Sequence, residues 1–511
     1  MWSAQFVSNI GGWMQVVGAQ WLMLALTHST TLIALISTAA ALPVLLFSVP
    51  AGVVSDLVDR RLLLLVAQTF MLVAAATLGV LALADIVTPW VLLALVFAVG
   101  TGQAFMSPTW QTLQPELVAP AQREQAISLG AVNMNLARAI GPAIGGLVLV
   151  ATSVGTVFMV NAATFVVVIL VILRWQETRS GGILPRERAG EATRAGARYV
   201  TASPALRGIL VRALLFTFFA SAIWALLPVI ATSKLHIGSG GYGLLLGLVG
   251  VGAVAGGALL PRLRERLTAG ALVTIGSLAV AGVTLILAWV PVLPLVAVAL
   301  VIAGVAWILV LSVLNSAYQL LLPGWVKARG MAFYLLAFQG GMAAGSAVLG
   351  VAAQQMGLSP TLFVAAAGLL LGPLVGMRYR FRNIPPDDLL PAGDWPQPNV
   401  SANEPVGGPV MVSVEYWPRP GLEDDLIAAL EQTRLGRRRT GATSWRVWRD
   451  AEDRGRILEQ FVVASWPEHL RQHERVTRRD QERLNRIRAM TDPGRPTIVS
   501  HWLTPELRSR P

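Results

Sequence analysis

An arginine stands near the middle of a long apolar segment. Arg138 lies within residues 125–150, and Asn133 and Asn135 precede it in the same segment. A guanidinium group inside a hydrocarbon layer costs roughly 2.5 kcal/mol or more, so it should face a cavity or a partner. Arg138 is therefore the first candidate for substrate binding or coupling chemistry, together with the two asparagines. The alternative is a packing role, in which carbonyl groups of an adjacent helix satisfy the guanidinium.

Amide and indole side chains recur in the other apolar segments. The amides are Asn9, Gln15, Gln20, Gln103, Asn161, Asn315 and Gln339, and the tryptophans include Trp13, Trp21, Trp110 and Trp224. Such a set suits the binding of an amphipathic organic molecule, although a tryptophan at the end of a span is more often an interface anchor. We take Asn9, Gln15 and Gln339 as further substrate or coupling candidates.

The residue types that are missing exclude several chemistries. The chain has no cysteine, which excludes disulfides, thiolate nucleophiles and Cys-ligated metal or iron–sulfur centres. No Asp or Glu lies well inside any apolar segment, so the usual carboxylate proton carrier is missing and the coupling ion stays unassigned. We therefore expect no catalytic residue, no metal, no cofactor and no enzyme activity, with the C-terminal part left open.

Charge divides the 511 residues into two parts of different composition. Residues 1–378 contain 28 Asp, Glu, Lys and Arg, about 7%, whereas residues 379–511 contain 40, about 30%. A charge content of 7% over such a length excludes a soluble globular domain. The C-terminal part has the composition and length of an ordinary soluble domain.

The apolar part contains two sets of six segments with the length that a membrane-spanning helix needs, about 20 residues. They lie near 3–26, 31–55, 62–84, 89–110, 125–150 and 152–173, and near 208–232, 240–260, 268–291, 293–317, 330–353 and 358–378. The prediction is an all-α polytopic membrane protein of twelve transmembrane helices. Its halves are residues 1–173 and 208–378, and a loop at 174–207 joins them. Residues 111–130 and 319–336 resemble each other weakly, and duplicated halves with a site at their interface are a recurrent transporter plan.

Basic residues alternate between the loops. One side carries all the basic loops, including the arginine-rich 174–207, while the other side has Lys234 alone. Cationic loops stay cytoplasmic, so we expect both termini and the central loop inside, a multi-pass location in the bilayer of the plasma membrane, and no nucleic-acid partner. The first apolar segment begins at Trp2, so a start upstream of Met1 is an open alternative.

The loop after the second segment carries a specific motif. It reads Gly52-Val53-Val54-Ser55-Asp56-Leu57-Val58-Asp59-Arg60-Arg61 and resembles the loop signature of the major facilitator superfamily. The resemblance implies that Asp56 caps the eleventh helix, near Gly330, and that Arg60 pairs with an acid at the inner end of the fourth, here Glu116. Gly52, Asp56, Arg60, Arg61 and Glu116 would then form a cytoplasmic gate. A merely solvated turn is the alternative.

The fifth segment carries small residues at helical spacing. Gly130, Ala137, Gly141, Pro142, Gly145 and Gly146 resemble the antiporter signature of the same superfamily, with one glycine replaced by Ala137. Small residues let another helix pack closely, and a proline frees a carbonyl and can kink the span. The resemblance implies an exporter, although ordinary close packing would give the same pattern. Val96 and Gly12 replace an arginine and an aspartate that many relatives have, which leaves proton antiport in doubt.

Residues 379–408 read as a linker and 409–511 as a compact cytoplasmic domain. Strands are expected at 410–416, 443–449, 457–465 and 497–503, and helices at 421–436 and 467–488. This βαββαβ order predicts an α+β ferredoxin-like domain. It resembles the small domains of antibiotic-biosynthesis monooxygenases, and the fusion is typical of a bacterial subgroup related to the enterobactin exporter. Self-association through this domain is an open expectation.

Two polar groups in the C-terminal domain have alternative interpretations. His469 and His473 have the i, i+4 spacing of metal ligands, but no carboxylate general base accompanies them, so a surface or dimer-interface pair is favoured. Arg437, Arg438 and Arg439 could contact anionic lipid headgroups or simply end a helix.

Together these features predict an alternating-access inner-membrane transporter. The favoured function is export of a small amphipathic organic molecule, such as a drug or a siderophore-like metabolite. An importer or facilitator is one alternative, and a transporter fused to an active monooxygenase-like tail is another.

Overall fold

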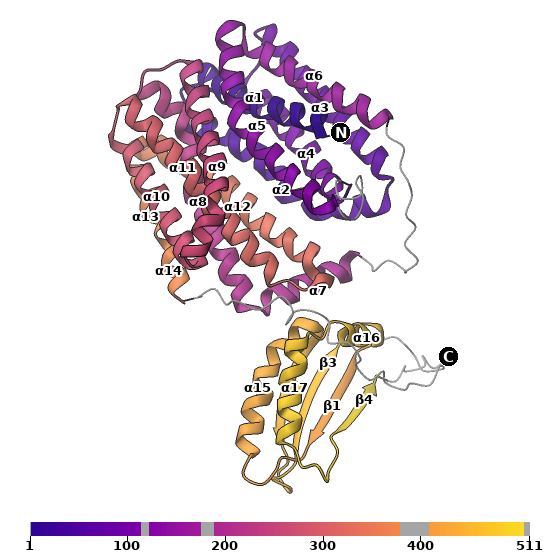
Figure 1. Cartoon of the computed structure of the whole chain (residues 1–511). Helices are drawn as coiled ribbons and strands as arrows, with labels where there is room; N and C mark the ends of the chain where they lie inside the picture. The colour runs from indigo at the N-terminus through magenta and orange to yellow at the C-terminus, as the bar shows by residue number, and fades with distance from the viewer. Residues whose placement is uncertain (1, 114–121, 175–188, 379–407, 505–511) are drawn as a thin grey trace. The chain divides into compact units, whose positions relative to one another are not determined.

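The computed structural model describes residues 2–113, 122–174, 189–378 and 408–504 (Figure 1). The chain forms two compact units. The first contains Met1–Leu184, Gly208–Ser316 and Tyr334–Phe381, and the second contains Pro185–Arg207, Ala317–Phe333 and Arg382–Pro511. The predicted linker at 379–408 lies almost entirely outside the described residues.

The helices of the first half follow the predicted apolar segments. They are α1 (Trp2–Leu26), α2 (Thr30–Leu57), α3 (Arg60–Leu83), α4 (Pro89–Leu113), α5 (Arg123–Ala151) and α6 (Val154–Arg174). Ser29 and Asp59 cap α2 and α3, because their side chains accept hydrogen bonds from the backbone N–H groups of Leu32 and Leu62. These caps place two helix starts that hydropathy alone does not fix.

The second half contains α8 (Pro204–Ser233), α9 (Ser239–Arg266), α10 (Ala269–Trp289), α11 (Leu293–Leu320), α12 (Lys327–Met356), α13 (Leu358–Leu369) and α14 (Leu371–Arg378). A short 3-10 helix, η3 (Gly324–Val326), precedes α12. The last predicted span is broken at Leu370 into α13 and α14. Figure 1 shows α1–α6 and α8–α14 as two groups of helices.

Eleven helical segments of the described chain are long and apolar enough to cross a bilayer, and they match eleven of the twelve predicted spans. The exception is α1, which is not among the eleven. Its polar Gln5, Asn9, Gln15 and Gln20 lower its mean hydropathy. A membrane-spanning role for α1 therefore stays a prediction.

One helix lies where only a loop was expected. The described part of 174–207 contains α7 (Ala189–Thr201), which belongs to the second compact unit. It packs against α15 (Glu423–Thr440) of the C-terminal domain and against η3. The sequence did not predict this helix because the stretch is rich in arginine and its buried face consists mainly of small residues and Tyr199, which give no clear apolar stripe.

The C-terminal domain is a four-stranded antiparallel sheet with three helices. Its strands are β1 (Val410–Tyr416), β2 (Ala442–Arg449), β3 (Ile457–Val463) and β4 (Ile498–Leu503), in the order β2-β3-β1-β4. The single helix expected at 467–488 is two helices, α16 (Trp466–Glu474) and α17 (Arg478–Met490). Thr477 caps α17 through a hydrogen bond from the N–H of Asp480, which explains the restart.

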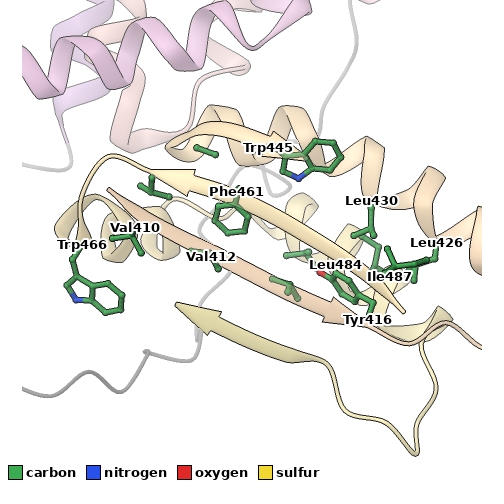
Figure 2. Packing of buried hydrophobic residues seen from close by; sticks show 14 residues of the cluster. Val410, Val412, Tyr416, Leu426, Leu430, Trp445, Phe461, Trp466, Leu484 and Ile487 are labelled. Atoms are coloured by element: carbon green, nitrogen blue, oxygen red, sulfur yellow. The ribbon is translucent and has the colours of Figure 1, made fainter. Parts of the chain in front are cut away.

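The core of this domain lies between one face of the sheet and the helices. Val412, Phe461 and Trp445 are cross-strand neighbours on β1, β3 and β2, and Leu426 and Leu430 of α15 join the same cluster (Figure 2). Alternate residues of β1 and β3 are buried, as a sheet covered on one face requires. The other face carries Trp448 and Trp502, which are 45% and 56% exposed.

The second compact unit also holds α7 and η3 through charged and aromatic contacts. Glu468 of α16 accepts hydrogen bonds from Arg198 of α7 and from Arg475, each at 2.7 Å. The Arg475 guanidinium lies 4.5 Å from the Trp325 ring centroid, and Trp325 meets Tyr199 edge to face at 5.6 Å. Burial raises the pKa of Tyr199 to about 12, so it stays neutral.

Candidate functional site

The face of α5 that carries Arg138 is opposite its most exposed apolar stripe. Leu129, Ile140 and Leu147 are 47%, 37% and 67% exposed and follow each other at spacings of 11 and 7, which place them on one stripe. Arg138 is two positions from Ile140, and a rotation of about 100° per residue turns it about 200° away. Arg138 therefore points away from this stripe, while Met134, one turn earlier on its own face, is 43% exposed.

The Arg138 side chain contacts a tryptophan ring of α1. The Arg138 guanidinium carbon lies 5.2 Å from the centroid of the Trp13 ring, within the range of a cation–π contact. Nε of Arg138 is buried and has no hydrogen-bond partner among the described residues. The guanidinium therefore keeps a donor that a ligand could use.

Aromatic rings continue from Trp13 into the second half. Trp13 lies 6.2 Å from Trp224 of α8, Trp224 lies 5.5 Å from Trp307 of α11, and Trp307 lies 6.3 Å from Phe338 of α12. We call Trp13, Arg138, Trp224, Trp307 and Phe338 the aromatic–arginine cluster. Each member stands near the middle of its helix, so the cluster joins four aromatic rings and one cation across the two halves.

Gly12 of α1 faces open space. A Cβ atom built on Gly12 would meet no atom within 4 Å, whereas one on Gly11 would lie 2.6 Å from Asn161. Gly12 precedes Trp13 on α1. The structure therefore has room for a side chain at position 12 but not at position 11. Trp307 adds a buried Nε1 with no hydrogen-bond partner in the described chain.

The glycines of α5 pack against two helices, as their spacing predicts. A Cβ on Gly141 would lie 2.5 Å from Trp13 Cβ, and one on Gly145 would lie 2.9 Å from Met14 Cα. One on Gly146 would lie 3.0 Å from the Cα of Gly243 in α9. Gly141 and Gly145 therefore bring α5 against α1, and Gly146 brings it against α9. Gly130 lies in α5 and is half-exposed, and Pro142 lies within the helix.

Several amide candidates are used between helices of the first half. Asn9 donates to Asn133 at 2.8 Å, Asn133 donates to the Trp2 carbonyl at 3.1 Å, and Gln5 donates to Asn9 at 3.0 Å. Asn133 is 2% exposed, so its bonds with Asn9 and with the Trp2 carbonyl join α5 to α1 rather than face open space, while the bond between Gln5 and Asn9 lies within α1. The structure places Asn9 and Asn133 together but not with the Trp224 and Trp307 rings.

Gln15 joins α1 to a different neighbour. It accepts a hydrogen bond from Asn161 of α6, and Thr164 donates to the Asn161 carbonyl at 2.7 Å. Gln15 is 6% exposed. Asn135 and Gln339 are half-exposed, and Asn135 has an interaction partner. Asn9 is half-exposed as well, whereas Gln15 and Asn133 are buried.

Comparison with known proteins decides the class of molecule. Residues 1–510 match the family described as transmembrane secretion effector, a family of major facilitator superfamily transporters. This chain belongs to that family. It is a multi-pass membrane transporter of the major facilitator type.

Curated relatives of this transporter include siderophore and drug carriers. The staphyloferrin A transporter of Staphylococcus aureus (strain NCTC 8325 / PS 47) is 28% identical over 173 residues, which are 34% of this chain and 43% of that protein. The multidrug efflux pump Tap of Mycolicibacterium fortuitum is 26% identical over 397 residues, which are 75% of this chain and 95% of that protein. The chain therefore spans less than half the length of the first relative.

Solved transporters share the fold. The nucleoside transporter NupG has a TM-score of 0.55 at 11% identity and covers 74% of this chain and 99% of its own. A bacterial homologue of the human lysosomal transporter Spinster, inward-facing and unoccupied, has a TM-score of 0.59 at 14% identity over 75% of this chain and 97% of its own. These likenesses establish the fold of the membrane part.

The motif from Gly52 to Arg61, predicted to form a gate, is only partly described. Glu116 lies outside the described residues, and of Gly52 and Asp56 the structure describes the α2 backbone alone. Arg61 donates to the Leu173 carbonyl of α6 at 2.5 Å, and Arg60 has an interaction partner. The predicted pairs of Asp56 and Glu116 therefore stay predictions.

The histidines of the C-terminal domain form an aromatic cluster. The His469 ring lies 4.5 Å from His473 and 4.8 Å from His501 of β4, and 5.4 Å from Trp466. Burial first, and then the charges of His473 and His501, lower the pKa of His469 to about 3. Within the described ranges no group of three or more His, Asp or Glu is arranged to hold a metal ion. His469 is 1% exposed and is therefore a core residue, whereas the sequence favoured a surface or dimer-interface pair.

Arg437 pairs with a buried glutamate and does not point toward lipid headgroups. Its guanidinium donates twice to Glu459, at 3.0 Å each, and Glu459 also accepts from Tyr416 at 3.0 Å and Trp445 at 2.9 Å. Glu459 is 0% exposed. The Arg437 guanidinium and these hydrogen bonds outweigh burial and hold the pKa of Glu459 below its usual value. The lipid interpretation is wrong for Arg437, because a long side chain on a helix can turn into the core as readily as outward.

Sequence reasoning missed three residues that the structure makes prominent. Trp307 was not singled out, although an aromatic residue in mid-span was a visible signal. Arg212 of α8 is 2% exposed, and a Cβ on Gly376 of α14 would lie 2.7 Å from its guanidinium. Tyr242 of α9 is 0% exposed and donates to Gln20 of α1. Each meets partners distant in sequence, which periodicity does not reveal.

Proposed function

We propose that this chain exports a small amphipathic organic molecule across a bacterial inner membrane by alternating access, with both termini in the cytoplasm. The observation that carries the proposal is the aromatic–arginine cluster, in which Trp13 and Arg138 of one half meet Trp224 of the other near the middle of the helices. Transporters of this plan bind substrate at the interface of their halves near the bilayer midplane.

The chemistry of the cluster favours a molecule with a flat apolar part and an anionic or hydrogen-bond-accepting group. Aromatic faces take up planar apolar groups, while the Arg138 guanidinium presents a fork of donors that matches a carboxylate. The substrates named for the relatives, a siderophore and drugs, are of the same broad class. The small-residue motif of α5 favours export over import or facilitated diffusion.

Vesicles of defined orientation test the proposal. Inverted membrane vesicles containing the transporter should accumulate an exported dye or siderophore-like compound, whereas right-side-out vesicles should not. Trp224→Phe should raise KM several-fold, and the control Trp289→Phe should not, because Trp289 is 77% exposed. Accumulation in right-side-out vesicles alone would show import and contradict the proposed export. Equal KM values for the two tryptophan variants would exclude the aromatic–arginine cluster as the substrate site.

We propose that Gly52, Asp56, Arg60, Arg61 and Glu116 form the cytoplasmic gate. The spacing of the α2–α3 motif supports it, and Asp59 offers a matched comparison because it caps α3 through Leu62 N–H at 2.9 Å. Asp56→Asn should slow transport at normal protein level, while Asp59→Ala should lower stability by about 1 kcal/mol through the lost cap. Wild-type transport rates in Asp56→Asn would count against the gate.

We infer that the C-terminal domain is a ferredoxin-like module of the kind found in antibiotic-biosynthesis monooxygenases, and that the chain falls in the subgroup resembling the enterobactin exporter. The βαββαβ order with α16 and α17 in the last helical position, and the strand order β2-β3-β1-β4, support this assignment. The uncovered sheet face with Trp448 and Trp502 supports self-association. Trp502→Glu should convert a dimer into a monomer in mass photometry of the solubilised full chain. An unchanged mass would exclude this face.

A further inference from the structure

A buried glutamine connects four helices of the two halves. Gln20 of α1 is 2% exposed. Its Nε2 donates to the Trp224 carbonyl of α8 at 3.0 Å and to Ser37 of α2 at 3.3 Å, and its Oε1 accepts a hydrogen bond from Tyr242 of α9. Two of these partners belong to the other half of the transporter, so one amide group bonds both halves together.

The Trp224 carbonyl is available because of a proline. Pro228 lies within α8, four residues after Trp224. In an α-helix the N–H of residue 228 would bond the carbonyl of residue 224, but proline has no N–H. A free carbonyl in an apolar interior is costly unless another donor reaches it. Gln20 supplies that donor from the opposite half.

Trp224 also belongs to the aromatic–arginine cluster. Its ring contacts Trp13 and Trp307, while its carbonyl receives Gln20. A molecule that binds between these rings contacts the Trp224 side chain, and Trp224 lies next to the point where Pro228 interrupts the hydrogen bonds of α8. Occupancy of the cluster and the bond to Gln20 therefore act on the same residue.

Further contacts join the halves toward the same ends of the helices. Thr30 N–H of α2 donates to Gln354 of α12 at 2.7 Å, Thr31 donates to the Gly350 carbonyl at 3.4 Å, and Trp21 stacks on Tyr242 at 6.2 Å. We call this region the α1–α2 end. Alternating access requires the halves to part here in one state, so every one of these contacts must break and reform in each cycle.

We propose that Gln20, Trp224 and Tyr242 form a reversible latch that closes the α1–α2 end, and that the Trp224 ring couples its release to occupancy of the aromatic–arginine cluster. The proposal rests on the proposed transport function. By the proposed orientation this end is extracellular, so the latch is the uncharged counterpart of the cytoplasmic gate. Neutral hydrogen bonds suit a contact that must open repeatedly, because each contributes little net free energy.

The absence of cysteine allows a direct test of latch closure. Thr30→Cys and Gln354→Cys are introduced together in the full chain, and the rate of disulfide cross-linking reports the closed α1–α2 end. The same cysteine pair is then introduced into three single variants, Gln20→Leu, Tyr242→Phe and Pro228→Ala. It is also introduced into the double variant that carries both Gln20→Leu and Pro228→Ala. Tyr242→Phe removes a single hydroxyl and keeps the ring, so it provides a variant that folds if Gln20→Leu does not.

The latch predicts different results for stability and for closure. Gln20→Leu should lower both the melting temperature and the cross-linking rate, because it orphans the Trp224 carbonyl and removes the bond between halves. Adding Pro228→Ala should restore the melting temperature, since the new N–H bonds that carbonyl within α8, but cross-linking should stay about two- to tenfold below wild type. Tyr242→Phe should lower cross-linking by a similar factor.

A purely structural role gives another pattern. If cross-linking recovers together with the melting temperature in the double variant, or does not change in Gln20→Leu and Tyr242→Phe, the latch is refuted. A planar aromatic carboxylate added to the wild-type pair should slow cross-linking, and no change would refute the coupling through Trp224. Altered cross-linking in a protein that transports nothing in either vesicle orientation would leave the latch standing and overturn the proposed function.

Discussion

Replacing Arg138 by alanine should reduce transport at least about tenfold without removing the protein from the membrane. The guanidinium lies 5.2 Å from the Trp13 ring and keeps one buried Nε donor without a partner among the described residues, so the ring orients it and this donor can bind a ligand. A packing arginine would instead use its donors on neighbouring carbonyls. If Arg138 binds a ligand, Arg138→Ala loses specific transport activity, whereas if Arg138 has a packing role the variant loses folded protein.

The magnitudes follow from these contacts. Hydrogen bonds from a charged donor contribute about 1.5–3 kcal/mol, equivalent to about 10- to 150-fold in transport efficiency. The cation–π contact contributes about 0.5–2 kcal/mol, so Trp13→Ala should cost about 2- to 30-fold. Arg138→Lys keeps the charge but loses the planar fork, and it should recover only part of the activity.

The assay measures kcat/KM per folded transporter in proteoliposomes, with the amount of folded protein taken from size-exclusion peaks. Arg138→Ala should lose at least about tenfold at normal protein level, and Arg138→Lys should fall between it and wild type. Normal specific activity in Arg138→Ala, with both variants reduced only in amount, would end the functional assignment of Arg138 and favour the packing role.

Three further outcomes follow from packing and charge. Gly141→Leu should prevent stable insertion because even a Cβ there lies 2.5 Å from the Trp13 Cβ, whereas Gly12→Ala, which enters open space, should keep wild-type yield in a fluorescence detection assay. Glu459→Gln should destabilise the C-terminal domain by about 3–5 kcal/mol in urea unfolding, since it leaves Arg437 buried and uncompensated, and a loss below about 1 kcal/mol would contradict a buried pair. The folded pKa of His469 is depressed to about 3, so its contribution to stability is complete above about pH 6.5 and is lost as the pH falls toward 3. The free energy of opening of β1 and β3, obtained from hydrogen-exchange rates divided by the intrinsic rate at each pH, should therefore fall from pH 6.5 to pH 5, and His469→Asn should flatten that change.

The sequence by itself determined the membrane class and most of the helices. Runs of apolar residues near membrane thickness have few alternatives to a helix, because every backbone group must be bonded within the segment. The strands and helices of the C-terminal domain followed from alternation and turn residues in the same local way. The sequence did not predict that one expected helix is divided into α16 and α17. The division depends on a single local cap, in which the Thr477 side chain starts a new helix.

The candidate site was only partly predictable. Arg138 was found because an arginine in an apolar span is anomalous by itself, and the glycines of α5 were found because their spacing implies close packing. Asn133 and Gln15 were grouped with Arg138 on polarity, yet the structure uses them to join α1 to α5 and α6. Polarity in a span predicts that a partner exists, but not whether that partner is a helix or a ligand.

Tertiary structure alone decided which distant residues meet. Trp224 and Trp307 lie on different helices, and their contact depends on how α8 and α11 pack, which no local pattern encodes. The sequence shows that Pro228 frees the Trp224 carbonyl, but only the packed halves show that Gln20 reaches it. Local chemistry therefore determines which groups need partners, whereas the long-range packing of helices determines which partners they receive, because side-chain contacts between helices depend on crossing and rotation set by the whole bundle.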